Sequence, residues 1–142
     1  MVTPLGIVLV DVDHFKKIND ELGHQAGDVV LQELAKRVSG NLREYDGVGR
    51  YGGEEFLLVI PGCDLAATTR RAEDIRILIS KEPFLTAPGR PVVTVSMGVA
   101  AAEVSEPPEA LLRRTDEALY RAKRSGRNRV EPANEALTLV QS

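Results

Sequence analysis

The stretch Gly47-Val-Gly-Arg-Tyr-Gly-Gly-Glu-Glu-Phe-Leu-Leu-Val-Ile60 predicts a β-hairpin near the middle of the chain. Two strand-like runs, Gly47–Tyr51 and Glu55–Ile60, flank the pair Gly52-Gly53. A glycine pair between such runs is typical of a tight hairpin, because both central residues of the turn can need a positive φ. The hairpin places antiparallel pairing at the centre of the expected fold.

On the N-terminal side of this hairpin, Leu5–Val10 is an apolar, β-branched run that predicts a buried strand ending at Asp11. Asp13 is interpreted as the N-cap of a short helix over residues 14–21. A second helix is expected over residues 25–42, because its apolar residues recur on one face. The first half of the chain is therefore expected to contribute one strand and two helices before the hairpin.

The elements expected after the hairpin are a helix over 65–82, a strand over 91–103, a helix from Pro108 to just before Gly126, and a short strand over 129–130. Gly98 is interpreted as a bulge in its strand. The resulting order, βααββαβαβ, predicts an α/β (α+β sandwich) fold with a mixed, mostly antiparallel five-stranded sheet covered by helices. Residues 1–131 are expected to form one domain, and residues 132–142 a C-terminal tail.

Composition narrows the class of partner. The 142 residues carry 18 basic and 21 acidic side chains and a formal net charge of -3, which argues against a nucleic-acid partner. No apolar run approaches the roughly 20 residues that span a bilayer, so no direct membrane contact is expected. The chain has one cysteine, Cys63, which excludes an internal disulfide. A cytoplasmic domain is the resulting prediction.

Three carboxylates are candidates for chemistry. Asp11 ends the first predicted strand, and Glu54-Glu55 follow the glycine pair. Carboxylates gathered from two such places suit Mg²⁺, which prefers oxygen ligands and leaves positions for phosphate oxygens. From the residues alone, Glu54-Glu55 can equally be solvated hairpin charges. Gly52-Gly53 can likewise serve turn geometry or the close approach of a phosphate or base.

Five stretches in order along the chain resemble the GGDEF family of diguanylate cyclases, in its GGEEF form. They are Asp11-Val-Asp-His-Phe-Lys-Lys-Ile-Asn19-Asp20, Gly23-His-Gln-Ala-Gly27-Asp28, Tyr51-Gly-Gly-Glu-Glu-Phe56, Thr94-Val-Ser-Met-Gly-Val-Ala100 and Ala118-Leu-Tyr-Arg-Ala-Lys-Arg-Ser-Gly-Arg-Asn128. The resemblance extends from about Leu5 to Val130. It implies a nucleotidyl-cyclase-like fold that condenses two GTP into the bacterial second messenger cyclic di-GMP, with release of two pyrophosphates. It also implies a homodimer, because each domain binds one GTP.

The resemblance assigns the metal site to Asp11, Glu54 and the main-chain carbonyl of Val12, with Mg²⁺ as the expected ion and Mn²⁺ as the alternative. Glu55 would be a further carboxylate near the metal, or the proton acceptor for the 3′-hydroxyl. Lys16 would act with the two glutamates in catalysis.

The same resemblance places Asn19 and Asp28 at the guanine edge, and His24 near the nucleotide. An alternative for His24 and Asp28 is that they cap the second helix. The remaining substrate-binding positions implied are Gly52 and Gly53 beside the nucleotide and Lys16, Lys123 and Arg127 on the phosphates.

A second site is expected at Arg43-Glu-Tyr-Asp46, an RxxD stretch shortly before Gly52. In the family, RxxD at this offset is the inhibitory site for the product, so Arg43 and Asp46 are expected to bind cyclic di-GMP. Family members often add a further arginine, and the candidates here are Arg70, Arg71 and Arg76.

The chain starts at Met1-Val-Thr-Pro, without the D-x-L-T-G-L-x-N-R lead segment usual in the family. It is therefore expected to be a fragment of a larger signalling protein with an upstream sensory domain. The alternative function is a catalytically weak module that binds cyclic di-GMP through the RxxD site. A cyclase for ATP is disfavoured by Asp28, because adenine offers no N1–H to a carboxylate.

Overall fold

The predicted order of elements is confirmed in the computed structural model, which describes residues 3–134. The elements are β1 (Leu5–Val12), α1 (Phe15–Leu22), α2 (His24–Ser39), β2 (Gly47–Arg50), β3 (Glu55–Pro61), α3 (Leu65–Lys81), β4 (Val95–Ala101), α4 (Pro108–Arg124) and β5 (Arg129–Pro132). The second helix is shorter than the predicted 25–42, and the β4 strand is shorter than the predicted 91–103. The fold class is confirmed.

The five strands form one sheet in the order β2-β3-β1-β4-β5. β1 runs antiparallel to both β3 and β4, so that Asp11 lies opposite Glu55 on one side and Ser96 on the other. β4 and β5 are parallel and are connected through α4, since a parallel pair needs a crossover. The end of β1 therefore meets the starts of β3, β4 and β5 at one edge of the sheet.

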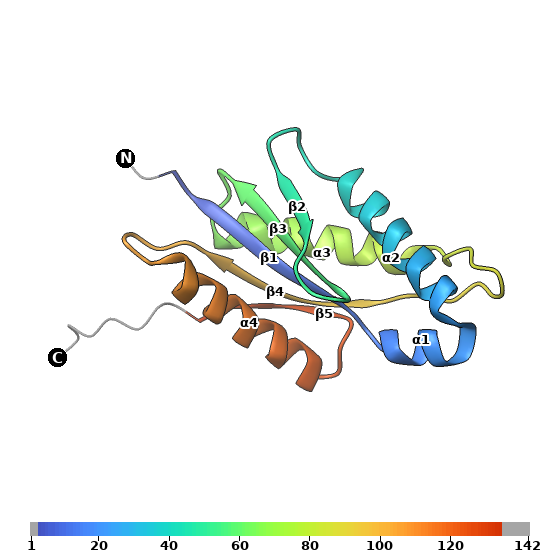
Figure 1. Cartoon of the computed structure of the whole chain (residues 1–142). Helices are drawn as coiled ribbons and strands as arrows, with labels where there is room; N and C mark the ends of the chain where they lie inside the picture. Colours follow the sequence, from blue (N-terminus) through green and yellow to red (C-terminus); the bar gives the residue numbers. More distant parts are fainter. Residues whose placement is uncertain (1–2, 135–142) are drawn as a thin grey trace.

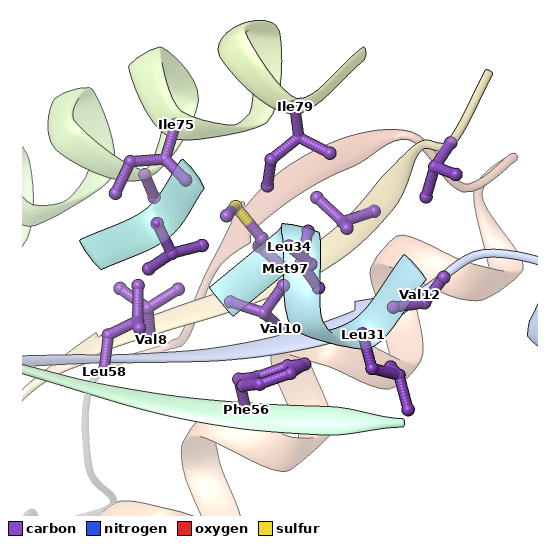
Figure 2. Close-up of a cluster of buried hydrophobic side chains, with 14 of the residues drawn as sticks. Val8, Val10, Val12, Leu31, Leu34, Phe56, Leu58, Ile75, Ile79 and Met97 are labelled. Carbon is purple, nitrogen blue, oxygen red and sulfur yellow. The ribbon is translucent and has the colours of Figure 1, made fainter. Parts of the chain in front are cut away.

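Helices cover both faces of this sheet (Figure 1). Alternate residues of a strand point to opposite faces. On one face, Val8, Val10 and Val12 of β1 pack in a cluster with residues of α2 and α3 (Figure 2). On the other face, Ile7 belongs to a cluster that includes Ala118 of α4. By this alternation Asp11 lies on the same face as Ile7, which is the face that α4 covers.

The prediction that Asp13 caps the first helix is wrong. The residue before α1 is His14, which has a φ of 56° and makes no side-chain capping bond. The Asp13 carboxylate, 4% exposed, instead accepts hydrogen bonds from the hydroxyls of Thr94 and Ser96 at 2.7 and 2.6 Å. Partners distant in the sequence thus outcompete the local capping geometry.

The turn between β2 and β3 is wider than the predicted tight turn. β2 ends at Arg50 and β3 begins at Glu55, and neither Gly52 nor Gly53 has a positive φ. The amide groups of Tyr51 and Gly52 donate to the Glu55 carbonyl at 2.8 and 3.3 Å. The backbone of this turn therefore does not require glycine for a left-handed conformation at either position.

Gly98 is also not at a bulge, because it pairs in register with Leu9 of β1 and Glu131 of β5. At the end of the described chain, Ala133 donates its amide to the Val99 carbonyl at 2.7 Å. Of the expected tail, residues 135–142 lie outside the described part. Among the helices of residues 3–134, none has the length and apolar character needed to cross a membrane.

Candidate functional site

Carboxylates meet at the sheet edge where β1 ends. Asp11, which is 6% exposed, is the penultimate residue of β1, and Glu54 directly precedes β3. The amide of Val12 donates to the Glu54 carbonyl at 3.3 Å, which ties the hairpin to the end of β1. The end of β1 and the β2–β3 hairpin, which are far apart in the sequence, are thus joined next to Asp11 and Glu54.

Lys123 supplies the opposite charge. Its ammonium Nζ lies 2.5 Å from the Asp11 carboxylate Oδ2, and only 8% of the Asp11 side chain is exposed. The contact follows from the fold, because Asp11 lies on the face of the sheet that α4 covers and Lys123 lies in the last turn of α4. A phosphate or cation entering here meets a charge pair that is already desolvated on one side.

The pKa values of Glu54 and Glu55 are both raised by their surroundings. Burial raises the pKa of the Glu54 carboxyl, the Asp11 charge raises it further, and Lys123 partly offsets both effects. Burial and the Asp11 charge also raise the pKa of Glu55, again against Lys123. Carboxylates whose ionised form is disfavoured by their neighbours gain most from a nearby cation, so the donor set suits a divalent metal ion.

Five of the residues predicted for the site line one recess of about 520 Å³: Asp11, Lys16, Glu54, Lys123 and Arg127. His14, Phe15, Lys17 and Asp20 complete its lining. The prediction had assigned no role to His14, Lys17 or Asp20. These residues lie close to Lys16 in and just before the first helix, so they were possible site residues. The sequence does not say, however, which face of α1 turns toward the end of β1.

Asn19, His24 and Asp28, predicted near the base, do not line this recess. Asn19 of α1 lies against Gly27 of α2, so close that a Cβ atom at Gly27 would be 1.9 Å from its Oδ1. His24 and Asp28 are exposed, and no capping bond from either side chain begins α2. Asn19 and Asp28 are therefore presented from adjoining positions on two neighbouring helices.

The glycine pair leaves room for a carboxylate. A Cβ atom at Gly52 would lie 2.8 Å from Oε1 of Glu55, whereas at Gly53 it would meet no atom within 4 Å. Gly52 thus allows Glu55 to fold back over the hairpin. Gly53 stays open on its outer side.

The RxxD stretch forms a compact charge cluster at the other end of β3. The Arg43 guanidinium donates to Asp46 Oδ1 through Nη2 at 2.7 Å and also to the Pro61 carbonyl at 2.6 Å. Arg71 of α3 donates to the other carboxylate oxygen of Asp46 at 2.8 Å. Of the three candidate arginines, it is Arg71 that reaches this cluster.

Asp46 is enclosed between the two arginines, and its side chain is fully buried. Burial alone would raise the pKa of this carboxyl, but the hydrogen bonds from Arg43 and Arg71 outweigh burial and hold the pKa far below its ordinary value. In Arg71, Nη1 is buried and has no hydrogen-bond partner among the described residues. The cluster therefore presents arginine donors held in place by an ionised carboxylate.

The residues at the sheet edge fit a divalent cation without forming a closed cage. Within residues 3–134, no three His, Cys, Asp or Glu side chains form a preassembled metal cluster. Mg²⁺ commonly uses one or two carboxylates together with water and substrate phosphates, which matches Asp11 and Glu54 beside an open recess. The arrangement thus suits a divalent ion that completes its coordination with water or phosphate oxygens.

Comparison with known proteins gives a family. The sequence profile described as "Diguanylate cyclase, GGDEF domain" matches residues 2–129. The response regulator PleD of Caulobacter vibrioides is 51% identical over 130 residues, which are 89% of this chain and 29% of that protein. The diguanylate cyclase DgcP of Pseudomonas aeruginosa is 45% identical over 130 residues, or 91% of this chain and 19% of that protein. The chain thus spans less than a third of these curated relatives.

Solved structures agree with these sequence relatives. The GGDEF domain of DgcB from Caulobacter crescentus, crystallised in complex with cyclic di-GMP, superposes with a TM-score of 0.89 and 34% identity. That match covers 94% of this chain and 80% of the DgcB chain.

Proposed function

The chain belongs to the GGDEF family of diguanylate cyclases, and from that premise we propose that it condenses two GTP into cyclic di-GMP and two pyrophosphates. The observation that carries the proposal is the recess where Asp11 and Glu54 meet Lys16, Lys123 and Arg127. Carboxylates for a metal and cations for phosphates, gathered at one edge, are the groups that phosphoryl transfer requires.

The chain's own residues would hold the triphosphate and a divalent ion and neutralise their charges. Lys16, Lys123 and Arg127 would bind the triphosphate, and Glu54, Asp11 and the Val12 carbonyl would hold a divalent ion, Mg²⁺ or Mn²⁺. When bound, such an ion supplies charge neutralisation for the nucleophile and the leaving pyrophosphate. Glu55, whose pKa is raised by burial and by the Asp11 charge, would accept the proton of the 3′-hydroxyl or complete the metal site. One domain binds one GTP in this scheme, so two copies of the domain must face each other.

The direct test is to remove co-purified nucleotide, add GTP and Mg²⁺, and measure the cyclic di-GMP formed by chromatography. The measurement is repeated over a range of protein concentrations. Product that rises more steeply than linearly with protein concentration is expected, because two domains must meet. Tight binding of cyclic di-GMP without any turnover would favour the alternative function, a product-binding module. A cytoplasmic location and an upstream sensory domain remain predictions.

Asn19 and Asp28 would read the guanine edge, and Gly27 offers a way to disturb them without changing either. In Gly27→Ala, the new methyl group displaces the Asn19 side chain, and we expect affinity for GTP to fall by about tenfold, as for one lost hydrogen-bonding group. Stability should change little, since Asn19 can rotate, and the small shift needed at the Phe15 ring, 3.2 Å from the new Cβ, is offset by the roughly 1 kcal/mol that alanine is worth over glycine inside a helix. Calorimetric titration with GTP and with ATP, plus thermal unfolding, measures both effects.

Gly40→Ala, at the other end of the same helix, is the matched control, because its Cβ would make only ordinary contact with the Lys36 carbonyl. Equal discrimination between GTP and ATP in wild type and Gly27→Ala would show that Asn19 does not contribute to base selection.

The RxxD cluster would bind the product, with Asp46 holding Arg43 and Arg71 toward it rather than meeting the base itself. Supporting this, the Asp46 side chain is buried while the Arg43 guanidinium is partly exposed and stacks on the Tyr45 ring, 4.5 Å from its centroid. We expect Arg43→Ala to weaken cyclic di-GMP binding by at least about tenfold, because charge-assisted arginine bonds are lost. Calorimetry with cyclic di-GMP provides the measurement.

Arg113→Ala, an exposed arginine on α4, is the control and should bind cyclic di-GMP like wild type. If Arg43→Ala also binds the product with wild-type affinity, the inhibitory site is not at the RxxD cluster.

A further inference from the structure

In the turn between α4 and β5, Arg127 has a backbone conformation that arginine seldom adopts. Gly126, Arg127 and Asn128 all have positive φ values, of 122°, 63° and 46°. Glycine adopts such values freely and asparagine tolerates them, but arginine is seldom found there. Left-handed residues other than glycine persist only where surrounding contacts hold them. Arg127, which lines the recess, has this conformation and therefore depends on contacts that keep the turn in place.

Within the turn, the Arg127 amide donates to the Ala122 carbonyl of α4 at 3.0 Å, and the contacts from elements distant in the sequence are made by Asn128. Its backbone amide donates to the buried carboxylate of Asp13 at 2.9 Å, from the side of the sheet edge. Its side-chain Oδ1 accepts from Nη1 of Arg76 at 2.7 Å, from the side of α3. The same nitrogen of Arg76 lies 3.4 Å from the Asn128 carbonyl oxygen. One end of the strained turn is thus fixed by two elements far away in the sequence.

Arg76 is itself held rigidly. Its Nε donates to Glu73 Oε2 at 3.0 Å, its Nη2 pairs with the other carboxylate oxygen, and its side chain is 17% exposed. The hydrogen bond to Glu73 raises the pKa of Arg76 more than burial lowers it, so the guanidinium stays charged. A guanidinium fixed on one side by a carboxylate presents its remaining N–H groups in one direction, here toward Asn128.

We propose that Arg76 is a positioning residue for nucleotide binding, which acts by holding Asn128 and thereby fixing the turn that presents Arg127 to the phosphates. The proposal rests on the proposed function, in which Arg127 binds the triphosphate of GTP. Arg76 does not line the recess, so its effect has to pass through the turn. The contact also links α3, which carries Arg71 of the RxxD cluster, to the edge of the recess.

The test compares four variants in binding to α,β-methylene-GTP with Mg²⁺, an analogue that cannot release pyrophosphate. Arg76→Ala is expected to lower affinity by about tenfold, the worth of one charge-assisted hydrogen bond. Arg127→Ala is expected to lower affinity by at least as much. The double variant should bind no more weakly than Arg127→Ala, because both changes remove the same contact to the phosphates. Arg76→Lys keeps one donor and should lie between wild type and Arg76→Ala.

Two measurements separate positioning from a general loss of structure. Arg76→Ala should bind cyclic di-GMP with wild-type affinity. Asn128→Gly removes the side-chain acceptor of Arg76 and leaves only the long contact to the backbone carbonyl. It leaves α3 unchanged and keeps a residue that accepts positive φ, so it should weaken analogue binding in the same direction as Arg76→Ala. Arg70→Ala, exposed on the same helix and without a hydrogen bond or ion pair among the described residues, is the control.

Wild-type analogue affinity in Arg76→Ala, or losses that add in the double variant, would overturn the inference while leaving the proposed function in place. A parallel loss of cyclic di-GMP binding in Arg76→Ala would overturn it as well, because the role would then be structural. If wild type fails to bind the analogue, or if Arg127→Ala binds it normally, the proposed function of the recess fails and the inference fails with it.

Discussion

Glu54→Gln is expected to lower the rate of cyclic di-GMP formation by about a thousandfold, which is the size of effect seen when several kcal/mol of charge stabilisation are removed from a phosphoryl-transfer site. The amide keeps the shape of the side chain but is a poor ligand for a divalent ion. Turnover from GTP and Mg²⁺, measured by chromatography, gives the rate.

The same substitution should not lower stability. The pKa of Glu54 is raised by burial and by the Asp11 charge, so its ionised form is less favourable in the folded than in the unfolded state. This unfavourable contribution is present at neutral pH and is relieved as the pH falls through the raised pKa. Glutamine removes it at every pH, and thermal unfolding at pH 7 should give a melting temperature equal to or above that of wild type.

Glu117→Gln, an exposed position on α4, is the matched control and should change neither property. Turnover in Glu54→Gln within tenfold of wild type would show that this carboxylate is not a required metal ligand. A lower melting temperature would show that the acidic group at the sheet edge contributes to folding, contrary to the electrostatics described above.

Local patterns predicted the elements well, because each depends on neighbours in the sequence. The order of strands and helices, the fold class and the family all follow from periodicity, turn residues and the five motifs, and all three are confirmed. Local reasoning failed at Asp13, where a capping position was expected. The hydroxyls of Thr94 and Ser96 and the amide of Asn128 satisfy its carboxylate instead, and no local signal announces partners so distant in the sequence.

The candidate site was predicted in part for the same reason. The motifs named Asp11, Glu54 and Lys123, but the contact between Asp11 and Lys123 depends on which helix covers which face of the sheet. Helical phase likewise could not choose among Arg70, Arg71 and Arg76. Only the packing of α3 decides that Arg71 meets Asp46 while Arg76 meets Asn128.

Gly98→Ala is expected to destabilise the fold by about 3 kcal/mol or more, at the upper end for overpacking substitutions. A Cβ atom at Gly98 would lie 2.3 Å from the Thr115 carbonyl oxygen and 2.4 Å from the Leu119 amide nitrogen. Both atoms belong to the backbone of α4, which cannot move aside as a side chain can. The whole helix would have to lift from β4, and thermal unfolding should show a loss of roughly 10 °C in melting temperature.

The position of α4 also determines where Lys123 lies in the recess, so the substitution has a second consequence. Lys123 reaches Asp11 only because α4 lies directly on the sheet, so any Gly98→Ala protein that still folds should bind GTP more weakly than wild type. Gly49→Ala on β2 is the matched control, since a Cβ there meets no atom within 4 Å, and it should be neutral or slightly stabilising. Equal melting temperatures for Gly98→Ala and wild type would mean that α4 can separate from β4 without cost, and the close approach at Gly98 would then not position Lys123.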